Sequence, residues 1–258
     1  MKKNYFLIVL CLFAMQLNAQ VAQRKATVAV GDFTGNYSSE MRNACIASMP
    51  RCRVNVVDWN SVRNNSNEAK NVDFIITCTL GNLSMERKQG TRFLTKETYY
   101  YYDGKITFNL VLKDARTGKI MATRNSFTSS SNEDRQKCLE ATLQMSSQEC
   151  RRLVDNGIVV SVPIKVVQDV KKDKVQTVVI DGGSNIGICP GLYFNVQMES
   201  EIAGSKIYKT VGTAKVKEVL SGELTLCEIT KGNKEIMKLL NDDVKLFFTS
   251  TEEPMIHF

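Results

Sequence analysis

Residues 105–127 read KITFNLVLKDARTGKIMATRNSF, and this stretch decides the fold of the first half of the chain. Apolar side chains occupy every second position from 106 to 112, which is the pattern of a strand with one buried face. Residues 114–118 are turn formers that end in Gly118, a residue suited to left-handed backbone. Residues 119–127 then predict the returning strand of an antiparallel hairpin.

Strands and helices alternate around this hairpin. Three short apolar runs before it predict strands, at 26–30, 53–59 and 72–80. A helix is expected between the first two runs, capped by Ser38 or Ser39 and ended by Pro50. After the hairpin, a capping box that begins at Ser131 predicts a helix to about Val154. Residues 20–157 are therefore predicted to form one domain of α/β (α+β) class.

From residue 158 the pattern changes to short strands separated by glycine-containing turns. Five or six strands are predicted, at 158–167, 175–180, 192–198, 207–219, 223–229 and 244–249. A short helix is expected over 234–240. Short strands with regular turns are typical of a small barrel, so residues 158–250 are predicted to form a small SH3-like β-barrel domain with a tail at 251–258.

The N-terminus has the anatomy of a secretory signal peptide. Lys2 and Lys3 precede an apolar run, and the small residue Ala19 stands at the expected cleavage position. The run is too short to cross a bilayer as a helix, and no later segment is long and apolar enough. Leu10 precedes Cys11 where a lipoprotein needs a small residue. We therefore expect residues 1–19 to be a signal peptide and the mature chain to lack a lipid anchor.

The charge distribution argues against a nucleic-acid partner. The chain has 34 Lys and Arg residues against 27 Asp and Glu residues, and the bases are scattered. A nucleic-acid-binding protein would concentrate its cations in a stripe with interleaved aromatic residues. Weak attraction to anionic glycan or lipid surfaces is still compatible with this composition.

Few residues are suited to catalysis or metal binding. His257, the only histidine, stands next to the C-terminal residue, which argues against a histidine-based triad or metal site. The glycine-rich segment 181–187 lacks the second glycine of a dinucleotide site and the Lys-Ser/Thr of a phosphate loop, so it is interpreted as a turn. The sequence therefore predicts no catalytic residue, no metal site and no cofactor.

Eight cysteines are present, and one of them, Cys11, falls within the predicted signal peptide. An odd number then remains, so at least one stays unpaired or pairs with another chain. Cys45 and Cys52 are the pair expected to lie closest, at a helix end and the strand after it. Cys189 and Cys227 are a second candidate pair, within the barrel. The favoured alternative is that most of these cysteines are small buried hydrophobic residues.

Four consecutive tyrosines, Tyr99, Tyr100, Tyr101 and Tyr102, precede the hairpin strand. In a strand they would place two rings on each face, and tyrosine is enriched at binding interfaces. They are therefore candidate interface residues. The alternative is an ordinary strand, because tyrosine has high β propensity.

Three stretches resemble the CsgG family, which includes the curli secretion lipoprotein, and the related LpoB and TolB amino-terminal domains. They are VAVGDF at 28–33, VDFIIT at 72–77 and LKDARTGKI at 112–120. Residues 175–248 resemble more loosely the small C-terminal barrel of the flagellar protein FlgT. The resemblance implies a mixed β-sheet with flanking helices, and binding rather than catalysis.

These features together predict a non-enzymatic exported protein, an accessory for binding and envelope assembly in the periplasm or associated with the outer membrane. Expected partners are envelope proteins or cell-wall glycan, and an oligomer is compatible with the sequence. One alternative is a subunit or accessory of an outer-membrane secretion channel. Residues 84–104 argue against a pore, because 85–91 is too polar for a membrane-crossing strand. The other alternative is an unrecognised hydrolase in the interdomain cleft.

Overall fold

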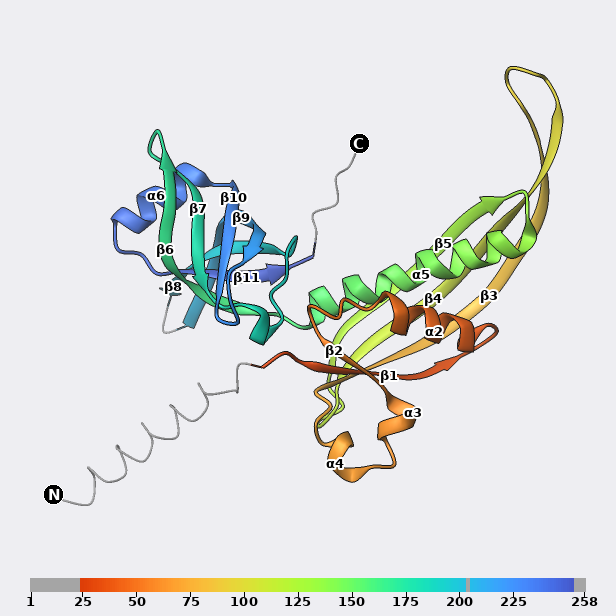
Figure 1. Cartoon of the computed structure of the whole chain (residues 1–258), viewed down its shortest axis with the longest axis horizontal. Coiled ribbons are helices and arrows are strands. Elements are labelled where there is room, and N and C mark those ends of the chain that lie inside the picture. Colours follow the sequence, from red (N-terminus) through yellow and green to blue (C-terminus); the bar gives the residue numbers. More distant parts are fainter. Residues whose placement is uncertain (1–23, 203–204, 253–258) are drawn as a thin grey trace.

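The computed structural model describes residues 24–202 and 205–252, which form a five-stranded sheet and a closed six-stranded barrel (Figure 1). The predicted fold class, a mixed sheet with flanking helices followed by a small barrel, is confirmed. The predicted signal peptide at 1–19 and His257 lie outside the described residues.

The sheet has the strand order β2-β1-β3-β4-β5 and is mixed because its two halves run differently. Its strands are β1 (Thr27–Thr34), β2 (Asn55–Asp58), β3 (Phe74–Thr91), β4 (Thr98–Asp114) and β5 (Ile120–Asn132). β1 lies parallel to β2 and β3, whereas β3, β4 and β5 form an antiparallel meander. Val28, Ala29 and Val30 of β1 are fully buried, as an apolar run at the centre of a parallel pair requires.

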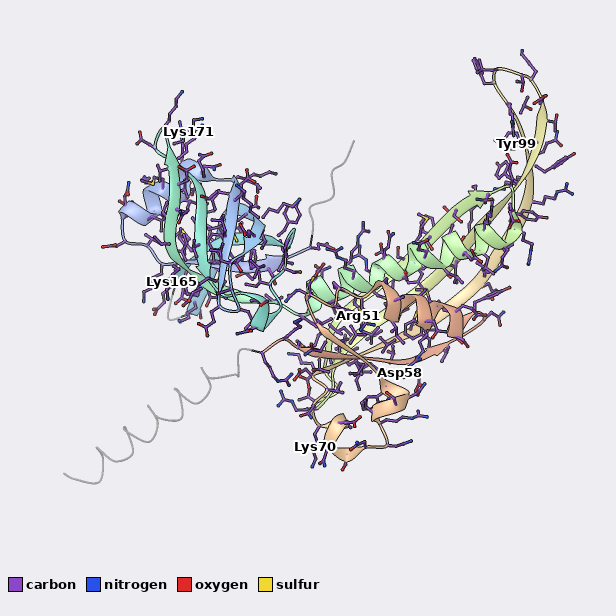
Figure 2. All side chains as sticks on the ribbon, in the orientation of Figure 1. Arg51, Asp58, Lys70, Tyr99, Lys165 and Lys171 are labelled. Atoms are coloured by element: carbon purple, nitrogen blue, oxygen red, sulfur yellow. The ribbon has the colours of Figure 1, made fainter. Side chains whose placement is uncertain are left out.

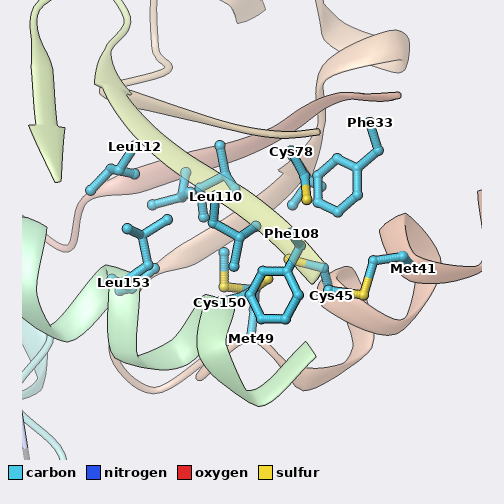
Figure 3. Packing of buried hydrophobic residues seen from close by; sticks show 14 of the residues in the cluster. Phe33, Met41, Cys45, Met49, Cys78, Phe108, Leu110, Leu112, Cys150 and Leu153 are labelled. Carbon is cyan, nitrogen blue, oxygen red and sulfur yellow. The ribbon is translucent and has the colours of Figure 1, made fainter. Parts of the chain in front are cut away.

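Two helices cover one face of the sheet, α2 (Ser38–Ser48) and the long α5 (Arg135–Gly157). The alternating apolar residues of β4 point toward these helices and are buried, as predicted. Figure 3 shows Phe108, Leu110 and Leu112 of β4 packed against Cys150 and Leu153 of α5. The short helices α3 (Trp59–Val62) and α4 (Ser66–Ala69) follow β2.

The predicted starts of both helices were wrong. Tyr37, in left-handed backbone, is the N-cap of α2, in place of Ser38 or Ser39. The N-cap of α5 is Asp134, whose carboxylate accepts the Lys137 N–H at 2.9 Å. Ser131 cannot cap α5, because it still belongs to β5 and pairs with Asp103 of β4.

The barrel closes in the order β10-β7-β6-β11-β8-β9. Its elements are β6 (Ser161–Lys171), β7 (Lys174–Asp181), β8 (Tyr193–Ile202), β9 (Ser205–Val219), β10 (Leu224–Lys231), α6 (Asn233–Asn241) and β11 (Leu246–Thr251). Phe194 and Phe248 are fully buried inside it, with ring centroids 6.1 Å apart. The glycine-rich segment contains the short helix η1 (Ser184–Ile186) between β7 and β8.

Candidate binding surface

The most prominent feature outside the two cores is a two-stranded arm. Pairing between β4 and β5 ends at Tyr102 and Asn132, but β3 and β4 stay paired as far as Thr91 and Thr98. Residues 86–103, which we call the arm, therefore begin at the last pairs with β5 and extend beyond the sheet as two strands, at the end away from the barrel (Figure 1). The sequence pattern predicts no strand through residues 81–98. A ribbon with both faces in water needs no apolar alternation, so that signal is absent.

Cross-strand contacts hold the arm together. Lys88 on β3 forms an ion pair with Asp103 on β4, and Lys105 approaches the same carboxylate at 3.2 Å. The hydrogen bond from Lys88 lowers the pKa of Asp103. The Tyr99 ring lies over Gly90 on the opposite strand, where an added Cβ would stand 2.7 Å from the ring. Aromatic rings over strand glycines stabilise such pairs.

The four candidate tyrosines all lie on β4 and run along the arm, from Tyr99 near the turn, labelled in Figure 2, to Tyr102 at its base. Tyr99 and Tyr101 stack with ring centroids 5.8 Å apart. The Arg87 guanidinium lies 4.3 Å from the centroid of the Tyr100 ring, and Tyr100 is half exposed. Contacts within the arm therefore engage Tyr99, Tyr100 and Tyr101, and an interface role for the four residues stays a prediction.

The tip of the arm exposes two large apolar side chains that sequence analysis did not single out. Phe93 is 92% exposed and Leu94 is 90% exposed. The turn beneath them is closed by hydrogen bonds from Arg92 N to Glu97 O and from Lys96 N to Arg92 O, both 2.9 Å long. The only available signal was an apolar pair in an otherwise polar segment, and a single pair carries no periodicity.

The arm that carries this apolar tip has a small excess of positive charge. Residues 86–103 contain four cations, Arg87, Lys88, Arg92 and Lys96, and three acidic residues, Glu86, Glu97 and Asp103. The Arg92 guanidinium carbon also lies 5.7 Å from the centroid of the Tyr99 ring, and Arg92 Nη2 forms an ion pair with Glu133 Oε1 at 3.4 Å. Exposed aromatic and aliphatic anchors inside a charged rim are typical of protein-binding surfaces.

Arg53 occupies the junction between the barrel and the unit formed by the sheet and its helices, here the sheet unit. Its side chain is 1% exposed. It donates to the Ile158 carbonyl, to the Gly187 carbonyl at 3.3 Å and to Ser250 Oγ at 3.3 Å. Burial lowers the pKa of Arg53, and the nearby carboxylate of Asp155 opposes that shift. Arg53 thus connects both parts of the chain.

The carboxylates at this junction are engaged by cations. Asp155 lies 3.7 Å from Arg53 Nε, and burial raises its pKa. Glu252, just after β11, accepts from Arg124 at 3.3 Å and from Asn156 at 3.1 Å. A glycosidase-type site would need two carboxylates free to contact a substrate. These contacts make the hydrolase alternative less favourable.

A small polar hollow of about 260 Å³ lies where β1 leads into α2. Its lining residues are Asp32, Phe33, Ser38, Ser39, Arg42, Asn43 and Asn60. Arg42 is already bound to Asp58 and to the carbonyls of Gly31 and Val30. Arg42, the cationic side chain that lines this hollow, therefore has a structural role.

The seven cysteines of the described residues are free thiols. The Cys45 thiol lies beside the Cys150 thiol inside the sheet-unit core, and the Cys52 thiol lies beside the Cys189 thiol at the junction. Cys227 is buried in the barrel, which raises its pKa to about 12. The structure thus gives Cys45, Cys52 and Cys189 neighbours other than the expected ones, and the two expected disulfides stay predictions.

Within residues 24–202 and 205–252, no three potential metal ligands come together. In that same part of the chain, no helix has the length and apolar character needed to cross a bilayer.

No family model and no curated protein sequence matches the chain. Solved structures match about half of it. A minor lipoprotein from Acinetobacter baumannii is 12% identical, with a TM-score of 0.31, over 49% of this chain and 91% of that one. A PelC dodecamer from Paraburkholderia phytofirmans is 7% identical, with a TM-score of 0.27, over 51% and 91%. Lipoprotein GNA1162 from Neisseria meningitidis is 12% identical, with a TM-score of 0.28, over 47% and 94%.

Similarities at these identities and TM-scores assign neither a family nor an activity. The resemblance to the CsgG family and to FlgT therefore stays a prediction.

Proposed function

We propose that this chain is a non-enzymatic exported envelope protein, an accessory that binds and helps assemble other components in the periplasm or at the outer membrane. In this proposal residues 20–157 and 158–250 are its two domains, and the arm is its partner-binding surface. The observation that carries the proposal is the pair Phe93 and Leu94, which is almost fully exposed at the arm tip.

Burying the tip against a partner would be favourable. Full burial of one Phe or Leu side chain contributes about 1.5–3 kcal/mol. The two-stranded ribbon below the tip, fixed by Lys88, Asp103 and the paired rings of Tyr99 and Tyr101, presents these anchors with little loss of backbone freedom. The tip therefore suits insertion into an apolar pocket.

The small excess of cations on the arm bears on the chemistry of the partner. Lys88 and Arg92 already pair with Asp103 and Glu133. The remaining positive charge of Arg87 and Lys96 favours an acidic surface around that pocket and would accelerate encounter at low salt. We infer an envelope protein with an acidic rim as the primary partner. Cell-wall glycan is the second candidate, because its anionic groups would also attract this tip.

The channel alternative has less support. A membrane-crossing strand needs about 9–11 residues that alternate between apolar and polar. On β3 the neighbouring residues Arg87 and Lys88 point to opposite sides, so each side of the arm carries a cation. An accessory that docks on another protein agrees better with this pattern.

Site-specific photo-crosslinking in living cells tests the proposal. A photoreactive phenylalanine analogue replaces Phe93, and the matched control carries it at Phe127, which is 68% exposed on β5 away from the arm. The expected result is one dominant crosslinked envelope protein from position 93 and none from 127. Its crosslink should weaken when Leu94 is changed to Ser and when the cells are held in high salt.

Three results would count against the proposal. They are equal crosslinking from positions 93 and 127, products that contain only cytoplasmic proteins, and recovery of the chain in the cytoplasmic fraction. Binding to purified cell-wall sacculi that requires Phe93, without a protein crosslink, would replace the protein partner with glycan.

A further inference from the structure

Two cysteines from different parts of the chain meet at the junction. Cys52 lies in the exposed turn before β2, where Figure 2 labels its neighbour Arg51. Cys189 lies in the segment between η1 and β8 and is 5% exposed. The two thiol side chains lie close enough to interact directly.

The chain segments beside these cysteines are also in contact, and this contact holds the two cysteines near each other. Arg53, next to Cys52, donates from Nη1 to the carbonyl of Gly187 at 3.3 Å. Any Cβ on Gly187 would overlap the carbonyl oxygen of Arg53, so the two segments touch directly. Gly187 stands two residues before Cys189, and its φ of +80° lets the chain turn at this point.

We propose that Cys52 and Cys189, in place of the pairs Cys45–Cys52 and Cys189–Cys227 expected from the sequence, form a disulfide that fixes the barrel against the sheet unit when the chain reaches an oxidising compartment. The location in such a compartment rests on the proposed function, whereas the pairing itself rests on the junction geometry. Disulfides persist in exported proteins because these compartments are oxidising.

The exposures of the two thiols set the order of the reaction. The Cys52 thiolate attacks the disulfide of a small-molecule or protein donor, which gives a mixed disulfide and releases one donor thiol. The Cys189 thiolate then attacks Sγ of Cys52, which closes the protein disulfide and releases the second donor thiol. Two protons leave the protein, and two electrons pass to the donor.

The burial of Cys189 agrees with this order. Burial raises the pKa of Cys189 to about 12, and its interaction with the neighbouring Cys52 thiol adds to the rise. Thiolates are the attacking species, so the exposed Cys52 reacts with the donor first and Cys189 resolves the intermediate.

A second close thiol pair provides an internal comparison. The thiols of Cys45 and Cys150 also lie close together, but both are fully buried in the sheet-unit core. A disulfide donor reaches neither sulfur without local opening of the core. Cys52 is the one exposed cysteine of the described residues, so the junction pair should oxidise selectively.

The structural consequence is a fixed relation between the barrel and the arm. The disulfide would join the turn before β2 to the connection between β7 and β8, next to the contact of Arg53 with Gly187.

Thiol mapping of the purified chain tests the pairing. The reduced chain is equilibrated with mixtures of oxidised and reduced glutathione, free thiols are blocked with N-ethylmaleimide, and non-reduced peptides are identified by mass spectrometry. A peptide containing Cys52 joined to one containing Cys189, lighter by two hydrogens, is the expected product. C52S should abolish it without affecting folding, because this side chain is exposed, and C45A should leave it unchanged.

Two results in vitro would overturn the proposal. One is a persistent glutathione adduct on Cys52 with Cys189 still free, and the other is Cys52 joined to a different cysteine. In cells, a periplasmic chain with both thiols free after rapid acid quenching would also overturn it. Recovery of the chain from the cytoplasm, with the in vitro link intact, would instead overturn the proposed export.

Discussion

Replacing the buried Arg53 with Met should destabilise the protein more than the same replacement of an exposed arginine. The side chain is 1% exposed and donates to three acceptors, two of them in or beside the barrel. Met fills a similar volume but leaves those acceptors and the Asp155 carboxylate without their cation. Removing one partner of a buried ion pair costs about 3–5 kcal/mol. The hydrogen-bond lengths of 3.3 Å favour the lower end, about 3 kcal/mol.

Equilibrium urea unfolding measures this loss with two probes. Trp59, the single tryptophan, lies in α3 and reports on the sheet unit, whereas far-ultraviolet circular dichroism also reports on the barrel. In the wild type the two transitions should coincide, because Arg53 couples the two parts. In R53M they should separate. The control R51M removes a neighbouring exposed arginine and should change the free energy of unfolding by less than about 0.5 kcal/mol.

The loss should also depend on pH, through Asp155. Burial raises its pKa above the usual value of 3.8, and Arg53 and Arg151 limit that rise. The folded protein therefore binds this proton more tightly than the unfolded chain does. The stability contributed by this group is greatest at low pH and is lost as the pH rises through the folded-state pKa. Without Arg53 the pKa of Asp155 rises further. The loss of unfolding free energy in R53M is therefore largest at neutral pH and shrinks toward pH 3.8.

A double variant separates the ion pair from the hydrogen bonds. D155N in the R53M background should recover part of the loss, because the uncompensated carboxylate is gone. The reasoning is refuted if R53M loses less than about 1 kcal/mol, well below the cost of breaking a buried pair, or matches R51M. Coincident transitions in R53M would show that Arg53 does not couple the barrel to the sheet unit. If R53M fails to fold, R53K gives a milder test, because it retains the charge but loses the forked donors.

Two further substitutions test local features of the fold. G187A should destabilise the barrel clearly more than G191A in thermal unfolding. Both glycines have a φ near +80°, but only the Cβ at 187 meets another group, the Arg53 carbonyl, whereas nothing lies within 4 Å at 191. Equal effects would mean that backbone conformation alone explains the loss. D134A should cost about 1 kcal/mol by removing the α5 N-cap, measured by urea unfolding, and D134N should retain most of that stability. An equal loss in D134N would assign the effect to charge.

Much of the fold followed from local patterns. The buried positions of β4 follow from strict alternation at 106–112, because a strand alternates its side chains between two faces. The barrel strands were expected from short apolar runs between glycine turns, and all six are present. The start of α5 was misplaced because Ser131 and Asp134 both suit an N-cap. Only the continued pairing of β5 with β4 selects Asp134.

The candidate site could be predicted only in part. Sequence analysis marked Tyr99–Tyr102 but not Phe93 and Leu94, whose importance lies in their exposure at the end of a projecting ribbon. Such a ribbon is specified by cross-strand pairs, for example Gly90 with Tyr99, and these pairs appear only once the register is known.

The sequence by itself determined the type and order of the elements: a sheet with helices, then a barrel, with the hairpin at 105–127 in the first part. Local periodicity is enough for this, because the period of a strand or helix is a property of the backbone. The tertiary structure alone decided that Arg53 contacts Gly187, 134 positions away, and that Cys52 faces Cys189. Such contacts depend on the path of the whole chain, because the local sequence around each residue predicts the same helix, strand or turn whether or not the partner is near.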